Sequence, residues 1–200
     1  MQSITLQQLA GDTDIYLLDQ VLKGRYGDRD HVLDAGCGTG RNLHWFLYNH
    51  LICFGSDSNP EVIDQLHLQY PGLPAERFIV APVEALPFVS ATFDHVISSA
   101  VLHFAQHPNH FDAMLTEMVR VLKRGGSLFI RMASNIGIEN AVIEVGEGIY
   151  ALPDGSYRYL LTRPMLQRML AVHQLACIEP IKTVNVEDMR CMTTLVLLKL

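Results

Sequence analysis

The stretch from Val32 to Asn42, VLDAGCGTGRN, decides the fold of this chain. It begins with residues that favour a β-strand, and its three glycines, at every second position, cannot continue that strand. Glycine permits positive φ and lets a ligand approach the backbone closely, while the N–H groups at the start of the following helix face that ligand. The stretch therefore predicts a strand, a ligand-binding turn and a helix over about residues 41–48.

The composition limits the kinds of protein that this chain could be. Its 200 residues suit a single domain over residues 1–200, and a hydrophobic content of 49% is enough for a sizeable core. The net charge is −6 and no run of basic residues is present, so nucleic acid is not expected as a partner.

The cysteines and the N-terminal residues indicate a cytoplasmic protein. The four cysteines are scattered and none forms a C-x-x-C pair, as expected for free thiols in a reducing compartment. The N-terminal MQSITLQQLAGDTD lacks the pattern of a signal peptide, and no uninterrupted run of about 18 apolar residues occurs. We therefore expect no membrane partner.

Strands and helices alternate along the chain, and the continuous apolar strands are typical of a mostly parallel sheet with helices on both faces. Only a short link joins the last two strands, so that pair must be antiparallel. One or two helices are predicted over about residues 5–27, and single helices over about 41–48, 60–69, 110–122 and 164–172. Strands are predicted at 32–33, 51–57, 78–81, 93–99, 127–132, 177–186 and 193–200.

Two segments stand outside this alternation. Residues 1–28 form an N-terminal helical segment. Residues 133–162 contain several glycines and no clear periodicity, and long irregular stretches in compact domains are usually functional loops. We interpret residues 133–162 as an inserted lid over the ligand-binding end of the sheet.

Five motifs together resemble the class I S-adenosylmethionine-dependent methyltransferases: VLDAGCGTG, FGSDSNPEVI, VEALPF, FDHVISSAVLHF and VLKRGGSLFI. The resemblance covers most of the chain. It implies an α/β, Rossmann-like, doubly wound seven-stranded sheet with strand order 3-2-1-4-5-7-6, strand 7 antiparallel and helices on both faces. It also implies that S-adenosyl-L-methionine binds across the carboxyl ends of strands 1, 2 and 4 and leaves as S-adenosyl-L-homocysteine.

The resemblance assigns roles to the residues at these strand ends. Asp34 would meet the amino group of the cofactor, Asp57 the ribose hydroxyls, and Ser58, Val83 and Glu84 the adenine. The chain departs from the family at residue 82, where a proline replaces a frequent acid. The implied cofactor-binding residues are Asp34, Gly36, Cys37, Gly38, Gly40, Asn42, Asp57, Ser58, Val83, Glu84 and Ser99.

The acceptor is predicted to be a small molecule, methylated by direct in-line displacement without a metal. His103, just past strand 4, is the candidate catalytic base, because hydroxyl and protonated amine acceptors need one. The sequence SSAVLH after strand 4 lacks the Asn/Asp-Pro-Pro-aromatic motif of enzymes that methylate nucleic-acid amines. The candidate substrate-pocket residues are Tyr16, Arg131, Tyr157 and Arg190, and the protein is expected to be a monomer or a homodimer.

Three other interpretations remain open at this stage. A nicotinamide dinucleotide site would need G-x-G-x-x-G, but Arg41 stands where the third glycine belongs. His103, His107 and His110 are spaced like metal ligands on a helix, although Pro108 interrupts that helix. A protein that binds the cofactor without catalysis, or serves as a partner protein, would keep the same motifs.

Overall fold

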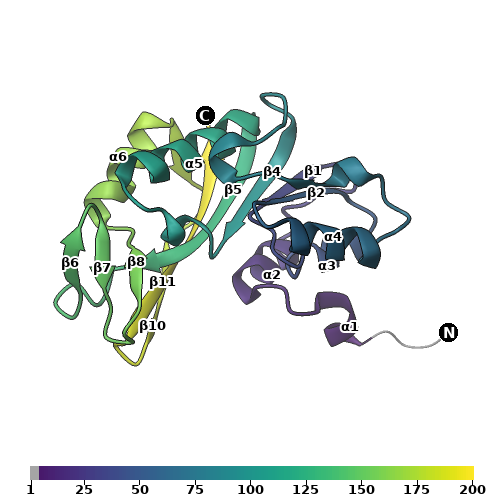
Figure 1. Cartoon of the computed structure of the whole chain (residues 1–200). Helices are drawn as coiled ribbons and strands as arrows, with labels where there is room; N and C mark the ends of the chain where they lie inside the picture. The colour runs from purple at the N-terminus through teal and green to yellow at the C-terminus, as the bar shows by residue number, and fades with distance from the viewer. Residues whose placement is uncertain (1–4) are drawn as a thin grey trace.

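The computed structural model describes residues 5–200 and contains a central mixed sheet with the order β10-β11-β5-β4-β1-β2-β3 (Figure 1). The pairs β1–β2, β2–β3, β1–β4 and β4–β5 are parallel, whereas β11 is antiparallel to β5 and β10. The predicted strand order, with strand 7 antiparallel, is confirmed. The strands are β1 (His31–Ala35), β2 (Ile52–Asp57), β3 (Phe78–Val80), β4 (Phe93–Ser99), β5 (Leu122–Ser134), β9 (Leu175–Cys177), β10 (Lys182–Val186) and β11 (Arg190–Lys199).

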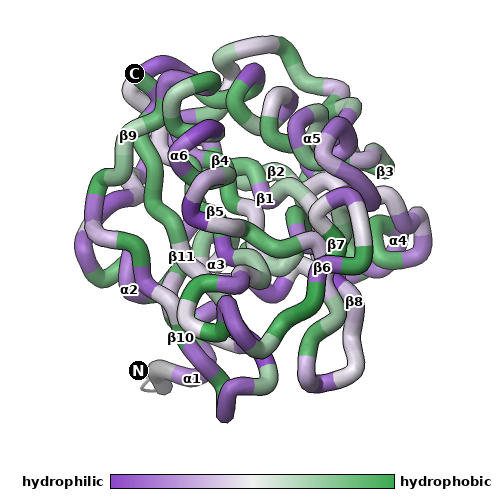
Figure 2. Tube along the Cα trace, turned by 90° about the vertical axis from the view of Figure 1, so that its left-hand side faces the viewer, coloured by the Kyte–Doolittle hydropathy of each residue, from purple (hydrophilic) through white to green (hydrophobic). Residues whose placement is uncertain are grey.

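Successive side chains of a strand point to opposite faces, and this alternation builds two apolar layers. Val32 joins one buried cluster with Phe46, and Leu33 joins the other with Leu115. Figure 2 shows hydrophobic stretches within the sheet, such as that of β11, inside a rim of mixed polarity. The helices are α1 (Leu6–Ala10), α2 (Ile15–Leu22), α3 (His44–Tyr48), α4 (Pro60–Gln69), α5 (Pro108–Val121) and α6 (Arg163–Val172), with 3-10 turns at Ala75–Arg77, Val83–Ala85 and Leu102–Phe104.

The observed boundaries correct two predictions and settle the number of helices at the start of the chain. The segment 5–27 contains two helices, because Gly11 has φ +55° and Asp14 caps a new helix through its bond to the Tyr16 N–H. The helix expected from residue 41 begins only at His44. The strand expected over 177–186 is two strands, β9 and β10, separated at Pro180, which has no N–H to donate to a sheet.

The segment 133–162 is more regular than its sequence indicates. Its first two residues still belong to β5, and the strands β6 (Ile143–Gly146), β7 (Ile149–Ala151) and β8 (Tyr157–Tyr159) form a separate antiparallel sheet beside β5 and β11 (Figure 1). Tyr159 stacks on Phe111 of α5 with ring centroids 5.2 Å apart, and Leu161 is fully buried. These contacts join the small sheet to the main core.

None of the helices that the structure describes is long and apolar enough to span a bilayer.

Candidate active site

A cavity of about 580 Å³ opens where β1, β2 and β4 end, at the glycine turn. The backbone N–H of Gly36 donates to the Ser56 carbonyl oxygen at 2.8 Å, which ties the turn to β2. Gly38 has φ +52°, and a Cβ built on it would meet no atom within 4 Å. A ligand in this cavity could therefore approach the Gly38 backbone as closely as the sequence predicts.

The carboxylate of Asp57 is held in a fixed orientation at the end of β2. Its Oδ2 accepts a hydrogen bond from the Gly38 N–H at 2.9 Å, and its Oδ1 accepts one from the Asn59 N–H at 2.9 Å. Each carboxylate oxygen keeps further acceptor capacity. Because Asp57 also lines the cavity, it can accept hydrogen bonds from two neighbouring hydroxyl groups of a ligand.

Asp34 lies beneath the turn, and its carboxyl group is only 1% exposed. Neither carboxyl oxygen has a hydrogen-bond partner among the described residues. Burial raises the pKa of Asp34 to about 7, against a smaller lowering by Arg41. Such an unpartnered buried acid favours a cationic group placed beside it.

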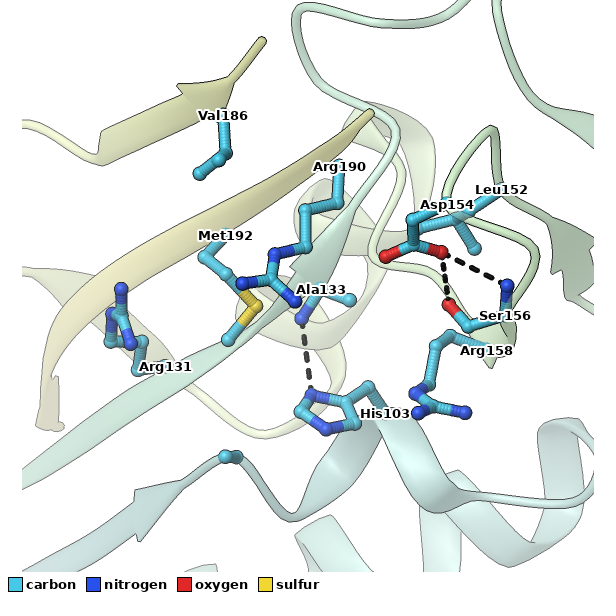
Figure 3. A pocket seen from close by; sticks show the side chains of 11 residues that line it. His103, Arg131, Ala133, Leu152, Asp154, Ser156, Arg158, Val186, Arg190 and Met192 are labelled. Atoms are coloured by element: carbon cyan, nitrogen blue, oxygen red, sulfur yellow. Dashed lines mark hydrogen bonds between the residues drawn. The ribbon is translucent and has the colours of Figure 1, made fainter. Parts of the chain in front are cut away.

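A second cavity, of about 480 Å³, shares the lining residue Ala100 with the first. Figure 3 shows this second cavity. Ala100 has φ +63°, an uncommon conformation for a residue with a side chain, and its N–H donates to the Arg131 carbonyl oxygen at 2.8 Å. The two cavities therefore meet just after β4. The second cavity is lined by Ala100, His103, Arg131, Ala133, Leu152, Asp154, Ser156, Arg158, Val186, Arg190 and Met192.

Three arginines give the second cavity its charge, and Figure 3 shows them approaching it from different sides. Arg131 on β5 donates from Nη1 to Oδ2 of the buried Asp14 at 3.0 Å and lies 5.3 Å from the centre of the Tyr16 ring. Arg158 lies 5.2 Å from the centre of the Phe104 ring. Among residues 5–200, neither Arg158 nor Arg190 has an acidic side chain within ion-pair distance.

His103 forms part of the wall of the second cavity and is 8% exposed. Its Nδ1 accepts a hydrogen bond from the Ala133 N–H at 3.3 Å, so the neutral ring carries its proton on Nε2. Burial, with Arg158 and Arg131 nearby, lowers the pKa of His103 to about 4. The lone pair that a general base needs is engaged by the backbone, which argues against the predicted base role.

The structure brings most predicted cofactor residues to the first cavity. Gly36, Gly38, Asp57, Ser58, Val83 and Glu84 line it, together with Pro82, the position at which the chain departs from the family pattern. The other five predicted residues lie outside its lining: Asp34 is buried beneath the turn, and the remaining four support the turn as follows. Asn42 Oδ1 accepts from the Asp14 N–H, Ser99 Oγ accepts from Arg41, Gly40 leaves no room for a Cβ against Leu66, and Cys37 is buried against Gly55.

Two of the four predicted acceptor residues, Arg131 and Arg190, line the second cavity. Tyr16 contacts Arg131 from behind. Tyr157 lines neither of the two cavities and its side chain is 61% exposed, because neighbouring residues of β8 point to opposite faces and Arg158 occupies the inner one.

The sequence prediction missed several lining residues. Val101, Phe104 and Gln106, which follow β4, and His110 and Met114 on α5 also line the first cavity. Only their place in the chain after β4 could have indicated them. Asp154 and Ser156, which line the second cavity, lie in the turn between β7 and β8, and no local pattern predicts where that turn packs.

The three spaced histidines have separate environments. His107 caps α5 through its bond to the His110 N–H at 3.1 Å, and His110 Nε2 lies 3.4 Å from Glu84, whereas His103 faces the second cavity. Within residues 5–200, no group of three His, Cys, Asp or Glu side chains is arranged to hold a metal ion.

Comparison with known proteins relates this geometry to a family. A family profile described as a methyltransferase domain matches residues 33–130. The chain is 35% identical over 121 residues to a malonyl-[acyl-carrier protein] O-methyltransferase of Herminiimonas arsenicoxydans, covering 58% of this chain and 42% of that protein. It is 38% identical over 106 residues to the phthiotriol/phenolphthiotriol dimycocerosates methyltransferase of Mycobacterium leprae, covering 48% of this chain and 35% of that protein. The chain therefore spans less than half the length of either relative.

Solved structures show the same fold over nearly the whole chain. A methyltransferase structure from Methanosarcina mazei, titled as S-adenosylmethionine-dependent, superposes with a TM-score of 0.74 at 19% identity and covers 90% of this chain and 97% of that one. The 1,6-didemethyltoxoflavin-N1-methyltransferase of Burkholderia thailandensis, solved with S-adenosylhomocysteine, superposes with a TM-score of 0.68 at 23% identity and covers 90% of this chain and 75% of that one. The sheet order, the glycine turn and the acid that ends β2 agree with these comparisons. Residues 33–130 belong to the methyltransferase domain family, and the chain has the class I S-adenosylmethionine-dependent methyltransferase fold.

Proposed function

We propose that this protein is an S-adenosylmethionine-dependent methyltransferase that methylates a small-molecule acceptor by in-line displacement. The observation that carries the proposal is the pair of cavities that share Ala100 at the carboxyl ends of the strands. One cavity has the glycine turn and the acid of a nucleoside site. The other, of about 480 Å³, suits an acceptor of small-molecule size.

The residues of the first cavity fit the proposed cofactor. Asp57 would accept hydrogen bonds from the ribose hydroxyls, and the open space over Gly38 leaves room for the chain of the cofactor. Asp34 is an unpartnered buried acid that would favour the ammonium group. When bound, S-adenosylmethionine supplies an electrophilic methyl group on a sulfonium.

The protein would contribute mainly by positioning. The acceptor cavity shares Ala100 with the cofactor cavity, so an acceptor bound there would lie beside the bound cofactor. Alignment of two reactants can lower a barrier by about 7–11 kcal/mol in favourable cases. Residues 133–162, which supply Leu152, Asp154 and Ser156, act as the wall that encloses the acceptor.

Calorimetric titration tests the cofactor assignment. Wild type should bind S-adenosylmethionine and S-adenosylhomocysteine but not NAD. Asp57→Ala should weaken that binding at least tenfold, and Asp57→Asn, which keeps one oxygen for a backbone N–H, should weaken it less. Asp64→Ala, on the exposed side of α4, is the matched control and should bind like wild type. Tight binding of NAD without S-adenosylmethionine would refute the assignment.

Methyl transfer is a separate measurement. Labelled S-adenosylmethionine incubated with hydroxyl, amine, thiol and carboxylate acceptors should label one of these classes. Cofactor binding without labelling of any class would instead indicate a non-catalytic cofactor-binding protein.

A further inference from the structure

The acceptor cavity has an excess of positive charge. Three guanidinium groups line it, from Arg131, Arg158 and Arg190, against a single carboxylate, that of Asp154. Asp14 neutralises Arg131 from behind, but no described acidic residue pairs with Arg158 or Arg190. Guanidinium groups bind carboxylates through paired hydrogen bonds, so the cavity favours an anion.

Arg131 provides a second, independent observation. Its Nε is fully buried and has no acceptor among the described residues, although Nη1 is bonded to Asp14. A buried donor without a partner costs free energy that a bound anion can recover. Arg131 lines the cavity that shares Ala100 with the cofactor cavity, so the side chain that carries this unused donor belongs to the acceptor side of the site.

The same cavity offers no effective proton acceptor. The Nδ1 lone pair of His103 is engaged by the Ala133 N–H, which leaves Nε2–H as a donor. Asp154 Oδ1 accepts from both the N–H and the hydroxyl of Ser156, and these bonds lower the pKa of Asp154. The cavity therefore lacks a general base for a methyl acceptor that must lose a proton during transfer.

Resting on the proposed methyltransferase function, we propose that the acceptor is a small organic carboxylic acid, bound as its carboxylate by Arg158 and Arg190 and methylated on a carboxylate oxygen. The oxygen lone pair forms the new C–O bond while the C–S bond of the sulfonium breaks and its electron pair stays on sulfur. The products are a methyl ester and S-adenosylhomocysteine. No proton moves, because the nucleophile is already ionised at neutral pH.

Charge separates this acceptor from the competing classes. A cationic amine would be repelled by Arg158 and Arg190, which have no ion-pair partner among the described residues, and an alcohol would need the base that the cavity lacks. His103 Nε2 and the unused Nε of Arg131 are both hydrogen-bond donors. They suit a methyl acceptor whose polar atoms only accept hydrogen bonds, as those of a carboxylate do.

Binding is tested first, on the full chain saturated with S-adenosylhomocysteine. Acetate, succinate, glutarate and benzoate are titrated by calorimetry or ligand-observed NMR, each beside its amide, and inorganic phosphate is titrated separately. At least one carboxylate should bind, and its amide at least tenfold more weakly. The double variant R158A/R190A should weaken that binding at least tenfold without changing the affinity for S-adenosylhomocysteine. R168A, an exposed arginine paired with Asp112 outside both cavities, is the control and should bind like wild type.

The product is tested next, with labelled S-adenosylmethionine. A methyl ester releases labelled methanol in mild alkali, whereas methyl ethers and N-methyl or S-methyl groups do not. Alkali-released label from the carboxylate that binds supports the inference. Three results would overturn it. Phosphate or the amides could bind as tightly as every carboxylate tested, the carboxylate that binds could accept no label, or the label could be stable in alkali. A chain that fails to bind S-adenosylhomocysteine would refute the proposed function itself, which separates the two failures.

Discussion

The Ala133 N–H donates to Nδ1 of His103 at 3.3 Å, and this bond determines which ring nitrogen carries the proton. Ala133 lies near the end of β5 and His103 follows β4, so the main sheet itself orients the ring. The imidazole in the wall of the acceptor cavity therefore has a donor at Nε2 and no free lone pair at Nδ1.

The first prediction concerns the stability of the fold at low pH. The pKa of His103 is lowered to about 4 in the folded protein, from the ordinary histidine pKa of about 6.5. Between pH 6.5 and pH 4 the unfolded chain therefore binds more protons than the folded chain. The stability contributed by neutral His103 is present above pH 6.5 and is lost as the pH falls, by up to roughly 3 kcal/mol. His103→Asn keeps an oxygen for the Ala133 N–H and does not titrate. Urea unfolding at pH 5 and pH 7.5 should show a smaller loss for the variant; equal losses would contradict the prediction.

Asp34→Asn should have opposite effects on stability and on binding. The pKa of Asp34 is raised to about 7 by burial, so the folded state is penalised as the pH rises from the ordinary Asp pKa through 7. The amide removes that penalty, and its gain over wild type should grow between pH 4 and pH 8 by up to about 4 kcal/mol. The affinity for S-adenosylmethionine should fall, since the ammonium group loses its acid. Thermal unfolding without cofactor and calorimetry with it give the two readouts, and a variant less stable than wild type at pH 8 would refute the charge argument.

The sequence predicted the main sheet well because its information is local. Each strand and its following helix have their own periodicity, and a parallel sheet with an antiparallel last strand follows from their order and from one short link. The break at Pro180 and the two helices before residue 23 depended on single capping or turn residues, which periodicity does not resolve.

The two cavities differ in how far they could be predicted. The cofactor cavity is formed by residues that directly follow strands, so the strand ends predicted Asp57, Gly38 and Glu84. The acceptor cavity combines β5, β11 and the small sheet, and Asp154 reaches it from a segment whose packing depends on tertiary contacts such as Tyr159 with Phe111. Side-chain direction also decides that Arg158, and not its neighbour Tyr157 on β8, faces the cavity. The irregular sequence pattern of this segment does not predict which of the two residues faces inward.

The last prediction compares two glycines with similar backbones and different surroundings. Gly38 has φ +52° and Gly125 has φ +77°, and a Cβ on either would meet no atom within 4 Å. Alanine at each should cost a similar amount of stability, about 1 kcal/mol, because both positions require the left-handed region. Of the two, only Gly38 lines the cofactor cavity. Gly125 lies near the amino end of β5, whereas the cofactor cavity lies at the carboxyl ends of the strands.

Calorimetry on the two alanine variants should therefore give different results at matched stability. Gly38→Ala projects a methyl group into the space that the cofactor needs and should weaken the binding of S-adenosylhomocysteine at least tenfold. Gly125→Ala should bind like wild type. Equal affinities for the two variants would show that the ligand does not approach the glycine turn, and would remove the basis for placing the cofactor there.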